Sequence, residues 1–520
     1  MPSRREIHAA LYVLGLAGLA FSTPLFVFVM SISQFFLLAN WLIEGKLKEK
    51  FKTFFKNKPA WIFTLIYLMH LVGIFYSNDL HHAIDDLRIK IPLLALPIII
   101  STSPKINRKS FHLILYAHIL GTLFYSITST YLFYKGNNTD IRDVFIYISH
   151  IRFSLNVCLD IFILFYLIFE KQIFPPWAKI LFLFVAFWFI YCLFFLESFT
   201  GITILIISTI GLLFIYIFKK TKHISCVFFI LFLIIIMAGV SLYLRNIYKD
   251  FSKREIIDKN KVEYLTKNGN PYLHDFDNKM TENGYYTWLY VSYEELEPAW
   301  NQRSTIKFDS LDYKGQPIKF TLIRFLTSKG LRKDQEGVNS LLKEEISLIE
   351  DGVANIGYVK KGGLEKRIKN VLWEYEHYKI THDPRGQSLM QRIELWQTSF
   401  RLIKKYFFTG VGTGDVKNVI TAQMHLENSH LKDAGLHPHN QFITITLTFG
   451  VPGLLLFLFC LLYPPIKRKK ISEYLFLSFF LIAMLSMFTE DTLETQAGVT
   501  FFTFFYCLFM FVDNKTQTNS

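Results

Sequence analysis

The residues best suited to chemistry form a short histidine motif ahead of an apolar segment. The motif is His437-Pro438-His439-Asn440. Pro438 suits the first turn of a helix, because its missing N–H is not needed there. His439 would then lie at the positive helix end, which favours the neutral imidazole. A neutral histidine can accept a proton from a hydroxyl, so the motif predicts a general base at His439, with a non-catalytic polar histidine as the alternative.

Two arginines supply a second candidate group. Arg152 lies a few residues inside an apolar segment, where a charge is expensive and usually faces a cavity or a partner. Arg392 lies early in an amphipathic segment, 388–408. Guanidinium groups bind phosphate oxygens in a fork geometry, so two near one pocket would suit a diphosphate. The alternatives are an interfacial arginine at 152 and a solvated helix charge at 392.

Other charged residues favour structural roles. Arg88 and Lys90 at the start of a short apolar segment predict interfacial anchors, with contact to an anionic lipid headgroup as the alternative. Glu490, Asp491 and Glu494 could bind a cation, but a solvated loop is the simpler prediction.

Nucleotide and metal sites are not predicted. The glycine run 409–414 lacks a preceding strand in a βαβ unit and a Walker Lys-Ser/Thr pair, so it predicts a tight turn. No HExxH motif, CxxC pair or DxD-like cluster is present, and the five cysteines all lie inside apolar runs. We therefore expect neither a metal nor a cofactor.

The composition predicts a membrane protein. Of 520 residues, 52% are hydrophobic and 53 are phenylalanine, and a spanning helix needs about 20 mostly apolar residues. Twelve stretches approach that length: 8–22, 24–43, 60–76, 89–102, 111–134, 147–169, 178–196, 200–218, 225–244, 438–463, 472–489 and 497–512. Much of the net charge of +14 lies in short loops between them, where basic residues set topology and do not indicate nucleic-acid binding.

The short loops alternate in charge along the chain. Basic residues mark one set of loops: Arg4, Arg5, Lys46–Lys58, Lys105–Lys109, Lys171, Lys219–Lys222 and Lys467–Lys470. The other loops are acidic or mixed. Because basic loops stay inside, both termini are predicted to be cytoplasmic and residues 245–437 to lie outside.

Residues 245–437 form a polar insertion of domain size. Segments 285–293 and 318–325 are rich in aromatic and β-branched residues and predict short strands. Segment 339–378 has helical periodicity, and the apolar stripe of 388–408 predicts a helix at the membrane surface. The predicted organisation is nine spans in 1–244, an α+β loop domain in 245–437, three spans in 438–512 and a cytoplasmic tail in 513–520.

The histidine motif belongs to a longer pattern. His439 and Asn440, followed after nine residues by Gly450 and then by Gly453, resemble the signature of the O-antigen ligase and Wzy-type polymerase superfamily. In that family the histidine stands at the head of the helix after the large periplasmic loop.

Two further segments are similar to the same family. The run from Arg392 to Trp396, with the glycine turn after it, resembles the family's arginine-to-tryptophan helix. Arg152 is similar to the family's earlier arginine at the outer end of a span. The twelve-span layout, with its large loop between spans nine and ten, also fits.

The resemblance implies a GT-C-like, all-α polytopic enzyme of the bacterial inner membrane with its site on the periplasmic face. The activity implied is that of a metal-independent, inverting glycosyltransferase with an undecaprenyl-diphosphate-linked glycan as donor. Arg152 and Arg392 would hold the diphosphate, and His439 would take the acceptor's proton. The supporting residues would be His437, Asn440, Trp396, Gly450 and Gly453.

The acceptor stays open at this point. A ligase transfers the glycan to lipid A-core, a polymerase to another lipid-linked glycan, and a protein O-glycosyltransferase to Ser or Thr; the resemblance favours the ligase modestly. A lipid-linked glycan transporter is the alternative of another class, although no internal repeat supports it. A membrane sensor is disfavoured, because only a few residues follow the last span.

Overall fold

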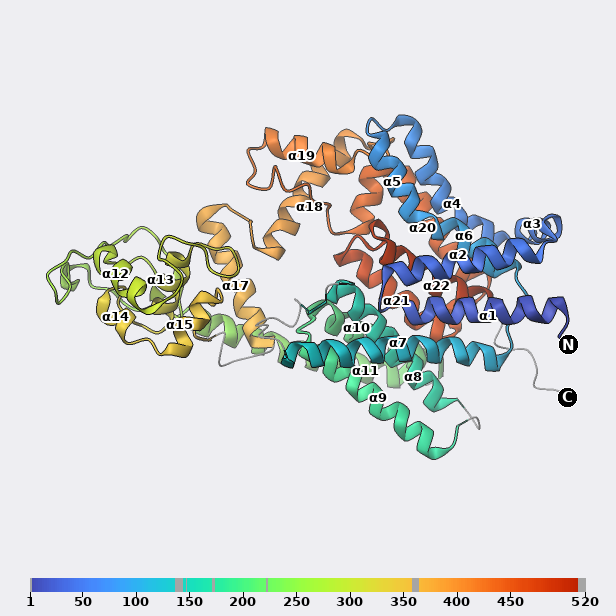
Figure 1. Cartoon of the computed structure of the whole chain (residues 1–520), viewed down its shortest axis with the longest axis horizontal. Coiled ribbons are helices and arrows are strands. Elements are labelled where there is room, and N and C mark those ends of the chain that lie inside the picture. The colour runs from blue at the N-terminus through green and yellow to red at the C-terminus, as the bar shows by residue number, and fades with distance from the viewer. Residues whose placement is uncertain are drawn as a thin grey trace. The chain divides into compact units, whose positions relative to one another are not determined.

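The computed structural model describes residues 2–135, 144–145, 147–170, 174–220, 223–357 and 364–512. The chain divides into two compact units (Figure 1). The first comprises Met1–Thr221 and Arg392–Ser520, and the second comprises Lys222–Gln391. The boundaries expected for the loop domain, 245 and 437, stay predictions.

Apolar helices build the first unit, because only helices satisfy every backbone hydrogen bond of a single segment in lipid. Its first part contains α1 (Arg4–Ser22), α2 (Val27–Glu44), α3 (Leu47–Lys56), α4 (Lys58–Gly73), η1 (Ile74–Tyr76), α5 (Leu80–Lys90), α6 (Pro92–Thr102), α7 (Arg108–Lys135), α8 (His150–Phe169), α9 (Pro176–Phe195) and α10 (Phe199–Lys220). Its second part contains α18 (Ser388–Lys405), α19 (Val416–Leu426), α20 (Gln441–Lys467), η4 (Lys470–Ser472), α21 (Tyr474–Thr489), η5 (Thr492–Glu494) and α22 (Gln496–Phe511).

Helix length and composition identify a polytopic membrane protein. Over the described part of the chain, eight helices are long and apolar enough to cross a membrane: α2, α4 with η1, α7, α8, α9, α10, α11 and α20. Each of the twelve predicted spans overlaps a helix. However, α6 has 11 residues, and such a helix rises only about 16 Å, half of the hydrocarbon core. The count of twelve therefore stays a prediction.

Phenylalanine-rich packing holds α8, α21 and α22 in place. Helix α8 packs against α9 and α21, and α22 packs against α6 and α21. The ring of Phe479 on α21 lies 5.9 Å, centroid to centroid, from that of Phe501 and 6.0 Å from that of Phe502. Aromatic pairs at this separation add to the apolar burial. The loop between α21 and α22 therefore starts and ends on well-packed helices.

Loops of like predicted charge meet in space. Lys56, Lys105 and Lys467, from three basic loops, line one pocket. From the acidic set, Asp86 and Glu494 both contact Lys90. These loops of like charge thus lie together, whereas the alternation of the remaining loops and their orientation to the two sides of the membrane stay predictions.

The second unit is mostly helical. It begins with α11 (His223–Phe251) and continues with η3 (Lys259–Lys261), β1 (Thr281–Glu282), β2 (Tyr285–Tyr286), α12 (Tyr293–Arg303), α13 (Ile318–Ser328), α14 (Gln335–Asn339), α15 (Lys343–Glu350) and α17 (Leu364–Thr381). Its core includes Trp300, Leu322 and Phe325.

The predicted strand at 318–325 is wrong, because this segment forms α13. Its apolar residues Ile318, Leu322 and Phe325 recur at helical spacing and are fully buried, so packing outweighs the β-branched composition. Of segment 285–293, only Tyr285–Tyr286 is a strand, paired antiparallel with Thr281–Glu282. Over its described residues, the expected α+β domain is therefore mainly helical, with one very short hairpin.

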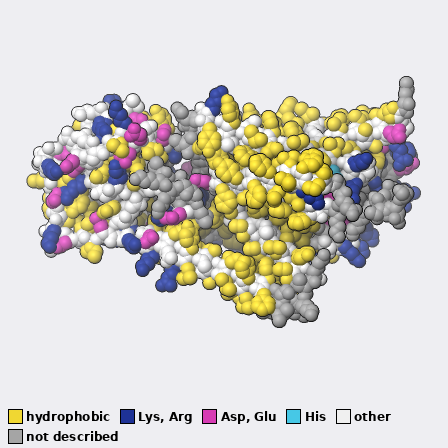
Figure 2. Space-filling view, turned by 90° about the horizontal axis from the view of Figure 1, so that it is seen from below, with side chains coloured by type: hydrophobic (Ala, Val, Ile, Leu, Met, Phe, Trp, Pro, Cys, Tyr) yellow, Lys and Arg dark blue, Asp and Glu magenta, His cyan; other side chains and the backbone are white. Residues whose placement is uncertain are grey.

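Surface composition differs between the apolar helices and the polar part of the chain. Hydrophobic side chains crowd the face over the apolar helices, whereas charged side chains of both signs mix over the polar part of the chain (Figure 2). Large exposed apolar residues such as Phe28, Phe35, Phe184 and Ile235 lie on α2, α9 and α11. An exposed apolar surface of this extent suits contact with lipid.

The predicted topology can be tested with single cysteines in a variant that lacks the five native ones. Lys307→Cys lies at an exposed position of the second unit, and Lys48→Cys lies on α3 in a basic loop. A membrane-impermeant maleimide should label the first in intact spheroplasts and the second only after permeabilisation. Labelling of Lys48→Cys in intact spheroplasts would contradict the assignment.

Candidate functional site

An acidic loop between α21 and α22 is the centre of the candidate site. Glu490 and Glu494 have side chains only 12% and 11% exposed, and Asp491 is buried. The prediction of a solvated loop for these three residues is therefore wrong. Buried carboxylates need charged or hydrogen-bonding partners, and each of the three finds them on a different helix.

Glu490 joins the predicted base to one predicted diphosphate ligand. Its Oε1 accepts a hydrogen bond from Arg392 Nη2 at 2.6 Å. Its Oε2 lies 3.9 Å from His439 Nδ1. Arg392 comes from α18 and His439 from the segment before α20, so the carboxylate brings two distant parts of the chain together.

Arg152 reaches the next residue of the same loop. It is the third residue of α8, as predicted, and the Ser149 hydroxyl caps this helix by accepting from the Arg152 amide. Its Nη2 donates to the Asp491 carbonyl oxygen at 2.9 Å. Its Nη1 is buried and has no hydrogen-bond partner among the described residues. One face of the guanidinium thus has an unused donor close to the acidic loop.

The helix after the histidine motif starts later than predicted. Asn440 is the N-cap of α20, and its Oδ1 accepts from the amides of Phe442 and Ile443. Pro438 and His439 therefore precede the helix, and His439 has φ +52° in the left-handed region. Asparagine is a preferred N-cap, which the sequence argument overlooked. The prediction that His439 lies in the first turn is wrong.

Asp491 fixes the backbone that carries His439. Its carboxylate accepts from the amides of His439 at 2.7 Å and Asn440 at 3.1 Å, and from Thr444 Oγ1 at 2.7 Å. Asn440 Nδ2 also donates to the Phe488 carbonyl at 3.0 Å. The conformation of the motif thus depends on α21 and on the acidic loop.

Glu494 holds the third cation, Lys90. The Lys90 ammonium lies 2.6 Å from Glu494 Oε2 and also contacts Asp86. Gln441 Nε2 donates to Glu494 Oε1 at 2.8 Å. Lys90 is fully buried, so the predicted interfacial anchor is instead a buried ion-pair partner.

A cavity of about 120 Å³ adjoins this ion pair and is lined by His437, Lys90, Glu494 and Thr444. His437 Nδ1 is buried and has no partner among the described residues. Burial lowers the pKa of His437 to about 4. The His437 ring is therefore neutral at neutral pH and does not add a positive charge to the cavity.

The carboxylates of the loop respond differently to burial. Burial raises the pKa of Glu490, but the contact with His439 and the charges of Arg392 and Arg152 outweigh it and hold this pKa below its usual value. Burial raises the pKa of Asp491 to about 6, against the opposing bond from Thr444. Both groups are therefore ionised at neutral pH.

Trp396 and the glycines position α18 against α20. Trp396 Nε1 donates to the Pro438 carbonyl at 2.7 Å. Helix α20 is broken at Gly450 (φ +69°), where a Cβ would lie 2.6 Å from the Phe407 carbonyl oxygen. At Gly410 (φ +67°) a Cβ would lie even closer to the Thr448 carbonyl oxygen, and the positive φ confirms the predicted tight turn. At Gly453 a Cβ would clash with the Phe449 side chain.

A buried polar chain below Arg152 was not foreseen from the sequence. Asn156 Nδ2 donates to the Arg152 carbonyl at 2.9 Å, and its Oδ1 accepts from His118 Nε2 at 2.9 Å. His118 Nδ1 lies 2.6 Å from Asp160 Oδ1. His118 thus joins Asn156 and Asp160, and the chain of hydrogen bonds links α7 to α8 below Arg152.

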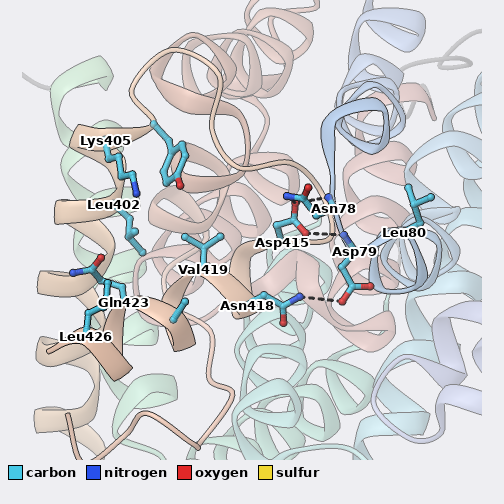
Figure 3. Close-up of a pocket in the computed structure, with 12 residues that line it drawn as sticks. Asn78, Asp79, Leu80, Leu402, Lys405, Asp415, Asn418, Val419, Gln423 and Leu426 are labelled. Atoms are coloured by element: carbon cyan, nitrogen blue, oxygen red, sulfur yellow. Dashed lines mark hydrogen bonds between the residues drawn. The ribbon is translucent and has the colours of Figure 1, made fainter. Parts of the chain in front are cut away.

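A second pocket, of about 550 Å³, lies between α18, α19 and the start of α5 (Figure 3). Asp415 accepts from the backbone amides of Asn78 at 2.7 Å and Asp79 at 2.8 Å, and Asn418 donates to Asp79 at 2.9 Å. These bonds attach α19 to α5, the helix of Lys90. The polar groups of this pocket thus mainly stabilise the packing of α19 against the start of α5.

The role of Asp491 leads to a stability prediction. Asp491→Ala leaves two backbone amides and the Thr444 hydroxyl without their acceptor, which should cost about 3 kcal/mol. The thermal midpoint of the purified protein in detergent should fall by several degrees. Asp85→Ala, which removes a half-exposed carboxylate from α5, is the matched control, and equal midpoints for the two variants would refute the anchoring role.

Comparison with known families agrees with this geometry. A family model described as O-Antigen ligase matches residues 353–458. No curated protein matches the chain. The matched segment contains Arg392, Trp396 and His439, which the acidic loop and the Pro438 carbonyl hold together. The match confirms the resemblance expected from the motifs: residues 353–458 of this membrane protein are similar to the O-antigen ligase family.

Proposed function

We propose that the chain is a glycosyltransferase that moves a glycan from undecaprenyl diphosphate to an acceptor on the periplasmic face, with lipid A-core as the favoured acceptor. The observation that carries the proposal is the meeting of Arg392 and His439 at Glu490, beside Arg152 at Asp491. A cationic ligand for phosphate and a proton acceptor are needed at one place in such a transfer.

The chemical step is a single displacement. The acceptor oxygen attacks the anomeric carbon of the first sugar, and the bond from that carbon to the diphosphate oxygen breaks. The leaving undecaprenyl diphosphate keeps the electron pair, and Arg152 and Arg392 stabilise its charge. His439 Nε2 takes the acceptor's proton. Because the acceptor attacks the anomeric carbon on the face opposite the leaving diphosphate, the configuration at that carbon is inverted.

Glu490 has two tasks in this scheme. Its contact with His439 Nδ1 favours the tautomer with hydrogen on Nδ1, which leaves Nε2 free to accept a proton. Its charge then stabilises the imidazolium that forms. Its bond to Arg392 keeps the guanidinium near the histidine until the diphosphate arrives. The donor must compete with Glu490 for this arginine, because both offer oxygen anions.

The first test replaces the base and the phosphate ligand. His439→Ala should lower glycan transfer in isolated membranes about 100-fold or more, as expected for loss of a general base. Arg392→Ala should lower it about 100-fold through loss of charge stabilisation, and Arg392→Lys should recover part of the rate. Lipid-linked glycan should accumulate in each inactive variant.

The control for this test is His425→Ala on α19, whose side chain is exposed and pairs only with Asp433 at 3.2 Å among the described residues. Its transfer rate should stay within about twofold of wild type, since such surface pairs contribute little. Wild-type transfer by well-expressed His439→Ala or Arg392→Ala would refute the proposal.

A deletion strain separates the three acceptors. On lipopolysaccharide gels, a missing ligase should remove the long-chain bands over an intact core while free polymer persists. A core carrying a single repeat would instead indicate a polymerase. An unchanged ladder with altered glycoprotein bands would indicate a protein O-glycosyltransferase, and either of these results would overturn ligation to lipid A-core.

A further inference from the structure

The basic loops of the first unit enclose a pocket away from the acidic loop. The pocket has a volume of about 640 Å³. It is built from the end of α3, the start of α4, the end of α6 and the ends of α20 and α22, with Tyr12 of α1. All of these elements except α3 are apolar helices, so the pocket opens where those helices leave the membrane.

The lining is strongly cationic. It includes Lys56, Lys58, Lys105, Lys467 and Arg468, and none of the described residues that line it is acidic. Three of these cations, Lys56, Lys58 and Lys467, have no carboxylate partner within the described ranges. Clustered ammonium groups repel one another, and a bound anion would relieve that repulsion.

Other basic residues of these loops are neutralised within the protein. Lys50 lies 2.7 Å from Glu44, and Lys470 lies 2.9 Å from Glu473. Both are buried. Setting topology requires only positive charge in the loops and does not require convergence on one recess. Lys56, Lys58 and Lys467, from two separate loops, nevertheless converge there without a carboxylate partner among the described residues.

The wall of the pocket also offers fixed polar groups. Arg468 Nη2 donates to Asn57 Oδ1 at 3.0 Å, and its guanidinium carbon lies 5.1 Å from the centre of the Phe511 ring. These contacts hold the guanidinium plane in place. Ser101 Oγ is buried and has no partner among the described residues. A hydroxyl and a positioned guanidinium are both donors suited to phosphate oxygens.

We propose that this pocket binds the phosphate headgroup of an anionic membrane glycerophospholipid. Lipid is favoured over a soluble anion because apolar residues line the pocket beside the cations: Tyr12, Ile100, Phe511 and Val512. They can contact the glycerol and the first acyl carbons while the lysines contact the phosphate. Basic pockets between spanning helices are known places for such headgroups. The proposal does not depend on the glycosyltransferase activity.

Binding can be measured by native mass spectrometry of the full-length protein with added phosphatidylglycerol or phosphatidylcholine. The wild type should retain phosphatidylglycerol and not phosphatidylcholine. The variant Lys56→Gln/Lys58→Gln/Lys467→Gln should bind phosphatidylglycerol about tenfold or more weakly. The control Lys48→Gln/Lys52→Gln/Lys109→Gln removes the same charge from positions in the basic loops that do not line the pocket, and it should bind like the wild type.

A thermal-shift measurement supplies a second readout on the same proteins. Phosphatidylglycerol should raise the midpoint of the wild type and the control more than that of the pocket variant. Equal binding by the two triple variants would overturn the proposal, as would equal retention of phosphatidylcholine. Displacement of the lipid by millimolar inorganic phosphate would also overturn it and identify a soluble phosphate as the ligand.

Discussion

Pairing of the buried carboxylates in the loop between α21 and α22 is the interaction on which the candidate site depends. Within five residues, Glu490 contacts Arg392, Asp491 accepts from the backbone before α20, and Glu494 contacts Lys90. Buried charge without partners would be strongly unfavourable. Helices α18, α20 and α5 therefore have to lie where their side chains and backbone amides can reach this loop. The negative charge of the loop constrains where these three helices can pack.

Gly410 and Gly450 allow α18 and α20 to pack closely. Helix α18 can deliver Arg392 only if its end lies close against α20, and Gly410 and Gly450 remove the side chains that would obstruct this approach. The break at Gly450 leaves carbonyl groups that the turn uses, because Val411 and Gly412 donate to Leu447 and Thr448. Close packing of α18 against α20 thus gives a physical reason for the glycines in the sequence pattern that resembles the O-antigen ligase signature.

The sequence predicted the parts that depend on local pattern. Apolar runs located the helices, and residue chemistry singled out His439, Arg152 and Arg392. It did not predict their partners, because an acidic loop is the same in sequence whether solvated or buried. Glu490 is 98 residues from Arg392, and nothing local encodes that contact. The strand predicted at 318–325 was wrong for the same reason, since this segment packs as a helix in a core cluster that also includes Trp300, far from it in sequence.

The same loop limits what the site can bind. At neutral pH Glu490 is ionised and occupies Arg392, so the resting site is close to electrically balanced and gives no strong general attraction for anions. A monoanion would gain little by replacing a carboxylate that is already hydrogen-bonded. Under the proposed function a diphosphate would gain more, because it carries more charge and offers several acceptor oxygens to Arg392. If the proposed donor binds here, competition with Glu490 for Arg392 would favour a diphosphate over a monoanion.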